Sequence, residues 1–350
     1  SHYVKEGDII DKEAQRRATS IYLVDRTIPM LPERLCNFIC SLRPNEEKLC
    51  YSCVFTLDGE ANVLNYRIVH TVIRSDRRYC YAEVQQLLED NGVVDGTGEP
   101  APAPGKEGYK GENALQLIML DALAKRLRQK RFRHGSVNFD TEELHFDIDE
   151  KGKPTRCYFK RSKDANKLIE EFMLLANRTV AESVACPGKG KKPKTLPYRI
   201  HDDPDPQKLE NLRELTAKLG YKMKSTSTKG ATARALNKLM EEVDGHREAK
   251  LVQTIALRSM MKAKYSTHNI GHFGLAFDYY THFTSPIRRY PDTMVHRLLT
   301  RYQDGGRSAN KNHYEELCEH CSDMEQIAQN AERDSIKYKM VEFMGEFVGE

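Results

Sequence analysis

Most strand-like segments of this sequence lie in its first 160 residues, and helical periodicity dominates the remainder, which limits the folds the chain can adopt. Apolar and polar residues alternate over 50–57 and 63–75, on either side of Asp58-Gly59, and this pattern predicts a β-hairpin. A second hairpin is predicted within 144–159. Apolar residues recur at helical spacing over longer stretches, at 112–129, 165–185, 206–219 and 314–345. The pattern predicts an α+β fold in which a mixed or antiparallel sheet is wrapped by long helices.

Length and charge exclude some classes of protein. The chain has 350 residues, enough for one large or two ordinary domains with a hydrophobic core. It contains no run of 18 apolar residues and no charged-then-apolar leader, so we expect no membrane span, no export and a cytoplasmic location. The 55 Lys and Arg residues barely outnumber the 51 Asp and Glu residues. Any nucleic-acid site must therefore be a local concentration of positive charge.

The nine cysteines are an odd number without a regular framework, which indicates reduced thiols. Cys50 and Cys53 lie on a predicted strand, where positions three apart point to opposite faces. Cys318 and Cys321 lie on a predicted helix, where Cys321 falls on the apolar side. Neither CxxC pair therefore favours a zinc site, and we expect no metal ligands among these residues.

The segment from His272 to Arg297, HFGLAFDYYTHFTSPIRRYPDTMVHR, has the highest density of aromatic, arginine and proline residues. Ser285-Pro286 predicts a helix start, which would place Arg288 and Arg289 in the first turn. Backbone N–H groups there favour an anion, and an arginine fork fits phosphate. Aromatic residues directly before this turn are suited to stacking on single-stranded nucleic acid, namely Tyr279, Tyr280, His282 and Phe283. The alternative is an amphipathic helix with solvated arginines.

Two further basic segments leave alternatives open. Arg74, Arg77 and Arg78 alternate with Tyr79 and Tyr81, which is compatible with a polyanion groove and equally with a charge-protected edge strand. The basic run at 125–134 suits either a solvated helix end or a phosphate track, and the helix end is favoured.

Glu171 and the segment 93–111 also stand out from their surroundings. Glu171 lies at the margin of an apolar helix stripe, where a carboxylate needs a partner or a task because a buried unpaired carboxylate is costly. Gly, Pro and Ala residues without periodicity over 93–111 predict a flexible surface loop.

The pattern HFGLAxxxYxHFTSPIRRYPD closely resembles the signature of the RNase R branch of the RNB family of 3′→5′ exoribonucleases. TSIYLVDRTIPMLPERLCNFICSLRPNEEKLC and DANKLIEEFMLLANRTVAE are similar to two further signatures of that family. The resemblance covers essentially residues 1–350 and implies an RNB catalytic domain. It also leads us to expect a chain cut at both ends, without the first strands, an aspartate cluster before Ser1 and the flanking OB-type barrels.

The resemblance assigns roles to individual residues. It implies that Arg288 acts on the scissile phosphate, that Arg289 assists in substrate binding, and that Glu332 is a carboxylate near the site. The substrate-binding residues that it implies are two aromatic clamps, Tyr22 and Phe139, and a pair beside the terminal ribose, Tyr81 and Glu171. If these assignments hold, Tyr22, Tyr81, Glu171 and Arg288 should line one continuous cavity.

The implied activity is processive 3′→5′ hydrolysis of single-stranded RNA to nucleoside 5′-monophosphates. Magnesium is the implied cofactor, with its ligands expected upstream of Ser1, so that residues 1–350 alone should be inactive. We expect single-stranded RNA as the partner, no DNA, and a monomer. The alternative is a non-catalytic RNA-binding or scaffold protein.

Overall fold

The computed structural model describes residues 2–93, 109–138, 142–224 and 228–347. Its strands form separate antiparallel two-stranded sheets, so the α+β class is confirmed, although the described strands do not join into one sheet. Three of these sheets are hairpins, β1 (Ile21–Tyr22) with β2 (Thr27–Ile28), β3 (Glu47–Leu57) with β4 (Val63–Arg74), and β5 (Glu143–Ile148) with β6 (Pro154–Lys160). The fourth pairs two strands that are distant in sequence, β7 (Tyr198–Ile200) and β8 (Lys264–Ser266). Most of the loop predicted at 93–111 lies outside the described residues.

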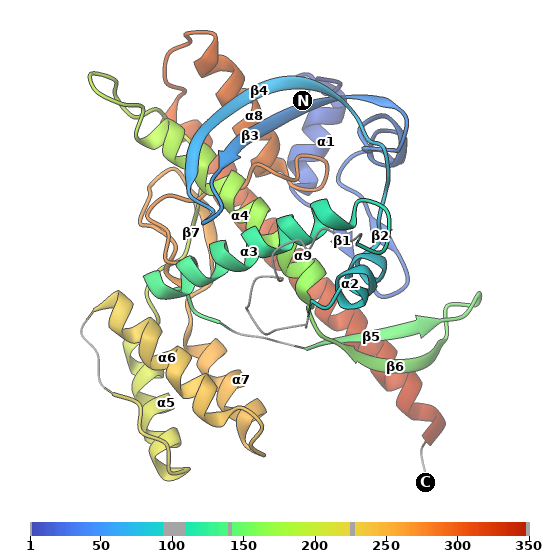
Figure 1. Cartoon of the computed structure of the whole chain (residues 1–350), viewed down its shortest axis with the longest axis vertical. Coiled ribbons are helices and arrows are strands. Elements are labelled where there is room, and N and C mark those ends of the chain that lie inside the picture. The colour runs from blue at the N-terminus through green and yellow to red at the C-terminus, as the bar shows by residue number, and fades with distance from the viewer. Residues whose placement is uncertain (1, 94–108, 139–141, 225–227, 348–350) are drawn as a thin grey trace.

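Long helices pack against these strands. The 34-residue helix α9 runs diagonally through the molecule and contacts β1, β6 and β8 (Figure 1). The α-helices are α1 (Ile9–Arg17), α2 (Tyr81–Asp90), α3 (Ala114–His134), α4 (Asp164–Ala185), α5 (Pro206–Lys218), α6 (Lys229–Val243), α7 (Ala249–Ser259), α8 (Tyr290–Gln303) and α9 (Lys311–Met344). Short π-helical and 3-10 segments are η1 (Arg34–Ile39), η2 (Phe273–Leu275) and η3 (Gly345–Phe347). Within the described part of the chain, no helix is both long enough and apolar enough to cross a bilayer.

The predicted β3–β4 hairpin is present, with its turn at the predicted place. The Asp58 carboxylate accepts hydrogen bonds from the backbone N–H groups of Glu60, at 2.9 Å, and Asn62, at 2.8 Å. A short polar side chain that bonds its own backbone in this way closes a turn without outside partners. For this reason the turn could be predicted from local sequence.

The main hydrophobic core joins α4, α8 and α9. Val180 on α4, Val295 on α8 and Cys318 on α9 are completely buried within it. Cys321 is also buried, as its position on the apolar side of a helix predicted. The core therefore holds α8, and the segment that leads into it, against two long helices.

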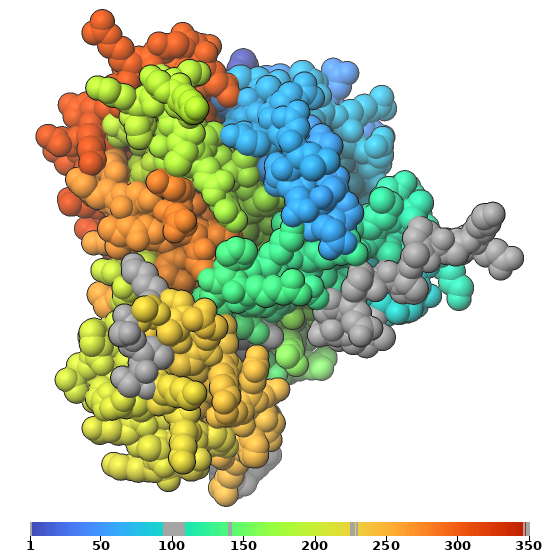
Figure 2. All heavy atoms as spheres, turned by 60° about the vertical axis from the view of Figure 1, so that its left-hand side comes forward, coloured from blue at the N-terminus to red at the C-terminus, as the bar shows by residue number. Residues whose placement is uncertain are grey.

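Helices α5, α6 and α7 form a lobe with a hydrophobic core of its own (Figures 1 and 2). Leu212, Leu236 and Val252 are completely buried in it, while Val137 and Phe273 extend into it from the main body. As predicted, α5 begins at Asp205-Pro206, where the Asp205 carboxylate accepts the backbone N–H of residue 207 at 2.9 Å.

Helix α3 differs from the prediction in the face that it buries. The apolar residues at helical spacing over 112–129 include several leucines, which such spacing places on the inward side, yet Leu115 and Leu120 are exposed. The buried face instead carries Lys125, whose ammonium lies 3.0 Å from Asp121 and 2.9 Å from Asp164 on α4. The leucine pattern misled because α3 has apolar residues around most of its circumference, and the ionic partner on α4 is distant in sequence.

Candidate functional site

The two arginines of the densest segment lie in a turn that precedes helix α8. The prediction that the helix starts after Ser285 is wrong, because α8 begins at Tyr290. In the turn, the backbone N–H groups of Arg288 and Arg289 both donate to the Ser285 carbonyl, at 3.3 and 3.1 Å. Pro291, and not Pro286, occupies the first turn of the helix.

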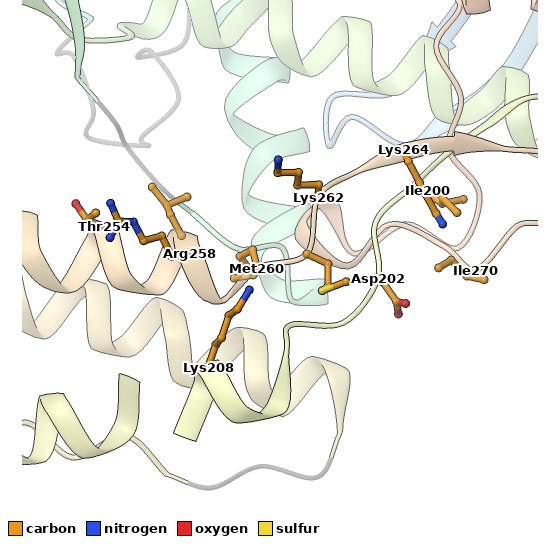
Figure 3. A pocket seen from close by; sticks show the side chains of 11 residues that line it. Ile200, Asp202, Lys208, Thr254, Arg258, Met260, Lys262, Lys264 and Ile270 are labelled. Atoms are coloured by element: carbon orange, nitrogen blue, oxygen red, sulfur yellow. The ribbon is translucent and has the colours of Figure 1, made fainter. Parts of the chain in front are cut away.

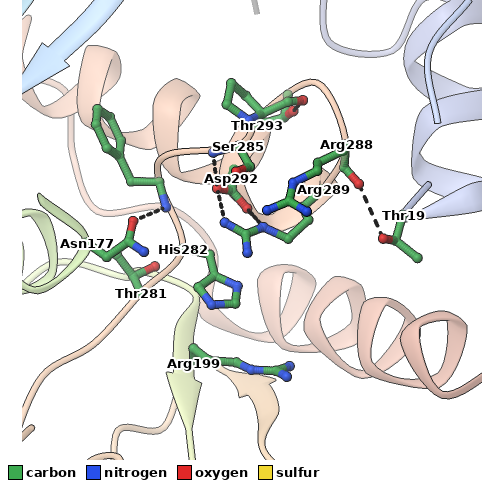
Figure 4. Close-up of polar contacts among 12 residues, drawn as sticks. Thr19, Asn177, Arg199, Thr281, His282, Ser285, Arg288, Arg289, Asp292 and Thr293 are labelled. Atoms are coloured by element: carbon green, nitrogen blue, oxygen red, sulfur yellow. Dashed lines mark hydrogen bonds and ion pairs between the residues drawn. The ribbon is translucent and has the colours of Figure 1, made fainter. Parts of the chain in front are cut away.

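Asp292 fixes the shape of this turn (Figure 4). Its carboxylate accepts the Ser285 backbone N–H at 2.7 Å and is held by the Arg289 guanidinium through Nε at 2.8 Å and Nη2 at 2.9 Å. Asp292 is fully buried, so this charge-assisted pair is shielded from water. The nearby carboxylate raises the pKa of Arg289 despite burial, which opposes it. Arg289 therefore holds the turn in place. Its role in substrate binding, through the N–H groups that do not bond Asp292, stays a prediction.

The turn is also docked on the N-terminal segment. The Arg288 carbonyl accepts hydrogen bonds from the Ser20 backbone N–H at 3.0 Å and the Thr19 hydroxyl at 3.2 Å (Figure 4). The Tyr290 N–H in turn donates to Ala18 at 2.8 Å. These bonds pair Arg289 with Thr19 and hold Arg289 in an extended conformation, which explains why the helix starts only at Tyr290.

Helix α1 reinforces this docking through Asp11. The cap of this helix is Asp8, which accepts the Asp11 N–H at 2.7 Å. Buried Asp11 instead lies 2.8 Å from the Arg297 guanidinium and accepts the Tyr290 hydroxyl at 3.0 Å. Both partners belong to α8, so the turn is anchored on each side.

The Arg288 side chain differs from Arg289 in being exposed. Among the described residues, its guanidinium has no hydrogen-bond or carboxylate partner. A rigid backbone thus presents a planar cation whose five N–H donors are free to bind phosphate oxygens.

His282 lies between this turn and a third arginine, Arg199 on β7 (Figure 4). Its Nδ1 lies 2.8 Å from the Tyr265 hydroxyl, and burial, assisted by Arg289 and Arg199, holds its pKa well below the usual range. Arg199 is paired with Glu325 on α9 at 2.6 Å. Sequence reasoning missed Arg199, because nothing near it in the sequence marks it.

The rings expected to stack on bases are largely structural. Tyr280 and Phe283 are buried in the protein, and Asn177 on α4 donates to the Tyr280 hydroxyl at 3.2 Å and accepts the Phe283 N–H at 2.9 Å. The prediction that these rings form a stacking surface is therefore wrong. They fix the approach to the turn and leave base stacking to other residues.

Tyr22 and Glu332 meet where β1 packs on α9. The Tyr22 backbone N–H donates to Glu332 at 3.0 Å, and the Tyr22 side chain is 47% exposed. Since Ser20, two residues earlier, bonds to Arg288, one short segment connects three predicted site residues. Tyr22 keeps an exposed ring face, which a base could contact.

Glu171 lies in a buried ion pair with Arg131 on α3. Both are almost fully buried, and the Arg131 guanidinium also donates to Ser136 Oγ at 2.8 Å, which donates to the Gly274 carbonyl at 2.9 Å. Burial raises the pKa of Glu171, and Arg131 opposes that rise. The expectation that the Glu171 carboxylate needs a partner is confirmed. The favoured interpretation of the basic run 125–134 as a solvated helix end is wrong for Arg131, which is buried.

Tyr81 is the first residue of α2 and lines a separate hollow of about 720 Å³ together with Tyr79, Leu168 and Ile169. Of the arginines in this segment, Arg77 is bound to Glu83 and Glu112, so its charge is compensated within the protein. Phe139 lies outside the described residues. The contacts thus connect Tyr22, Arg288 and Glu332, while one cavity shared with Tyr81 and Glu171 stays a prediction.

A resident metal ion does not fit the described residues. No group of three or more His, Cys, Asp or Glu side chains lies close enough in them to hold one. In the densest acidic stretch, Asp202 and Asp203 lie in the irregular segment before α5 and Asp205 caps that helix.

Comparison with known proteins decides the family. The RNB domain model matches residues 1–305. The chain belongs to the RNB domain family. Ribonuclease R of Aquifex aeolicus (strain VF5) is 40% identical to this RNB chain, over 100% of the chain and 47% of the relative.

Solved structures support the same RNB fold. Mycoplasma genitalium RNase R in complex with ribose methylated single-stranded RNA superposes on the whole chain with a TM-score of 0.85 at 27% identity, over 53% of that protein. Yeast Ssd1, described as a pseudonuclease, superposes on 95% of the chain with a TM-score of 0.72, and at 19% identity this likeness concerns the fold alone. The chain spans about half the length of the ribonuclease R relatives that it matches.

Proposed function

We propose that this chain is the core of a processive 3′→5′ exoribonuclease domain that hydrolyses single-stranded RNA to nucleoside 5′-monophosphates. The supporting observation is the exposed Arg288 guanidinium, which has no partner among the residues that the structure describes, on a turn anchored by Asp292, Ser20 and Asp11. A rigidly placed planar cation stabilises negative charge that develops on a phosphate during reaction, because it need not reorganise. In this proposal the domain extends over residues 1–350.

The other predicted residues enter the proposal as contacts to the RNA strand. Tyr22 stacks on a base, Glu332 fixes the backbone of Tyr22, and Glu171 with Tyr81 lies near the terminal ribose. Phe139 is assigned to the second clamp by resemblance alone. We further propose that magnesium ligands lie outside the residues described, that the parent protein acts in the cytoplasm, and that it is a monomer.

Substitution of Arg288 by lysine tests the catalytic role. It should be made in a preparation that also contains whatever sequence is encoded before Ser1. Lysine keeps the charge but loses the planar fork, so we expect turnover of labelled single-stranded RNA to fall at least a hundredfold while RNA affinity changes less than fivefold, on the order expected for one lost charge-stabilising contact.

Arg333→Lys is the matched control, because Arg333 is an exposed arginine on α9 whose contacts are local, with Asn330 at 3.1 Å and Asp334 at 4.0 Å. It should turn over RNA at the unsubstituted rate. Near-normal turnover in Arg288→Lys would overturn the assignment. RNA binding without turnover in the unsubstituted protein would favour the non-catalytic alternative.

A further inference from the structure

A second hollow, of about 750 Å³, lies where the α5–α7 lobe meets the paired strands β7 and β8 (Figure 3). Ile200 on β7 pairs with Lys264 on β8, and both line the hollow. Their neighbours Arg199 and Tyr265 form the next pair along the ladder, and Arg199 lies beside His282. Because successive side chains of a strand alternate between faces, this junction hollow opens on the opposite face of the strand pair from Arg199.

More positively charged than negatively charged side chains line the junction hollow. Four cations line it, Lys208, Arg258, Lys262 and Lys264, against the single carboxylate Asp202. Lys208 lies 4.0 Å from the half-buried Asp205, and Lys262 is bonded to the neutral amide of Gln326. Within the described part of the chain, Arg258 and Lys264 have no carboxylate within 4.0 Å. Uncompensated like charges at one place favour binding of an anion.

Apolar side chains share the hollow with these cations. Leu257, Met261 and Ile270 are 39%, 44% and 46% exposed there, which is unusual for large apolar residues grouped in one concave place. An inorganic anion would need only the cations. A ligand that carries a phosphate and a flat ring would use both, because thioether and aliphatic groups make favourable contacts with aromatic faces.

The wall of the hollow is fixed in advance of binding. His201 Nδ1 accepts the Gly274 N–H at 3.0 Å, so its Nε2 carries the proton and donates to the Met261 carbonyl at 2.7 Å. Burial lowers the pKa of His201, which favours this neutral form. A wall that is already ordered costs little to organise when a ligand arrives.

We propose that the junction hollow binds a nucleotide, with its phosphate at Arg258 and Lys264 and its base against Leu257 and Met261. The choice of a nucleotide over other ring phosphates rests on the proposed function. The nucleotide is either a free mononucleotide or one unit of an RNA strand, since both present the same phosphate and base. The site would serve product retention in the first case and strand guidance in the second.

Charge reversal tests the phosphate contact. Binding of AMP, of inorganic phosphate and of a labelled single-stranded oligoribonucleotide is measured with chelator present, so that hydrolysis plays no part. Arg258→Glu/Lys264→Glu should weaken AMP binding at least tenfold, and should weaken oligonucleotide binding only if a strand occupies the hollow. Lys218→Glu/Lys222→Glu, at the far end of α5, makes the same change of charge and should alter affinity less than twofold.

Methyl NMR of the methionines locates the ligand. Met260 and Met261 line the hollow, while Met344 lies at the end of α9 and serves as a distant reference. AMP should shift the first two signals and leave the third in place, and inorganic phosphate should shift them less. AMP saturation without those shifts, or unchanged AMP affinity in the charge-reversed variant, would overturn the proposal. Either result leaves the Arg288 experiment unaffected.

Discussion

Replacing Arg131 by methionine should destabilise the α3–α4 contact severely. Arg131 and Glu171 have side chains only 8% and 4% exposed, so the variant leaves a buried carboxylate without its counter-ion. Removing one member of a buried pair costs about 3 to 5 kcal/mol. The loss also removes the donor to Ser136 Oγ, which lies 2.8 Å away.

Hydrogen exchange of the α4 amides measures this cost, because it reports the free energy of opening at that helix. The control is Arg178→Met, on α4 itself. Arg178 pairs with Glu182, and the two side chains are 49% and 40% exposed; Arg178 also lies over the ring of Phe277. Because this ion pair is exposed to solvent, we expect its loss to change the opening free energy of α4 by less than about 1 kcal/mol.

A double variant and a pH series separate the lost charge from lost packing. Arg131→Met/Glu171→Leu removes both charges and should recover most of the stability. Burial already raises the pKa of Glu171, and loss of Arg131 raises it further. The single variant should therefore recover stability as pH falls through that raised pKa, since protonation removes the unpaired charge. A pH-independent loss, or a double variant as unstable as the single, would refute this reasoning.

Two further predictions concern the histidines and Tyr22. Burial lowers the pKa of His272 to about 3 and of His296 to about 4, and holds that of His282 well below its usual range. Below pH 6.5 the unfolded chain binds protons at these histidines that the folded chain does not bind. As the pH falls, the unfolding free energy should therefore drop by about 1.4 kcal/mol per pH unit for each histidine. Urea unfolding measures this drop, and an unfolding free energy that stays constant between pH 6.5 and 5 would contradict these shifts. Tyr22→Ala should weaken oligoribonucleotide binding, measured by fluorescence anisotropy, by about 1 to 3 kcal/mol, because a stacking ring is lost. Tyr22→Phe keeps the ring, and Tyr338→Ala removes an exposed tyrosine elsewhere, so neither should weaken binding. Equal affinity in all three variants would exclude Tyr22 as a clamp.

Features with local causes could be predicted from sequence. The Asp58 turn closes on its own backbone, and the start of α5 is set by Asp205 and the proline after it. Buried Cys321 followed from helical spacing alone. In each case the determining contacts lie within a few residues, so no knowledge of the tertiary fold was needed.

Features that depend on distant contacts were missed or mispredicted. Ser285-Pro286 has the local pattern of a helix start, but bonds between residues 18–20 and residues 288–290 hold Arg289 extended, so the turn does not continue into the helix. Burial of Arg131 in a cationic run depends on Glu171, forty residues away, and on a helix packing that periodicity does not reveal. The roles assigned to Arg288 and Tyr22 in RNA hydrolysis and binding rest on the resemblance and stay predictions.

Hydrolysis of an end-labelled RNA tests the central claim, that this RNB chain is the core of an exoribonuclease. A 5′-labelled single-stranded oligoribonucleotide is incubated with excess magnesium and either residues 1–350 or a preparation that includes the sequence encoded before Ser1. Because the described residues hold no metal-ligand cluster, we expect the first to bind without cleaving. The second should shorten the RNA stepwise from its 3′ end and release nucleoside 5′-monophosphates. Stepwise shortening by residues 1–350 alone, or none by the longer preparation, would contradict the account.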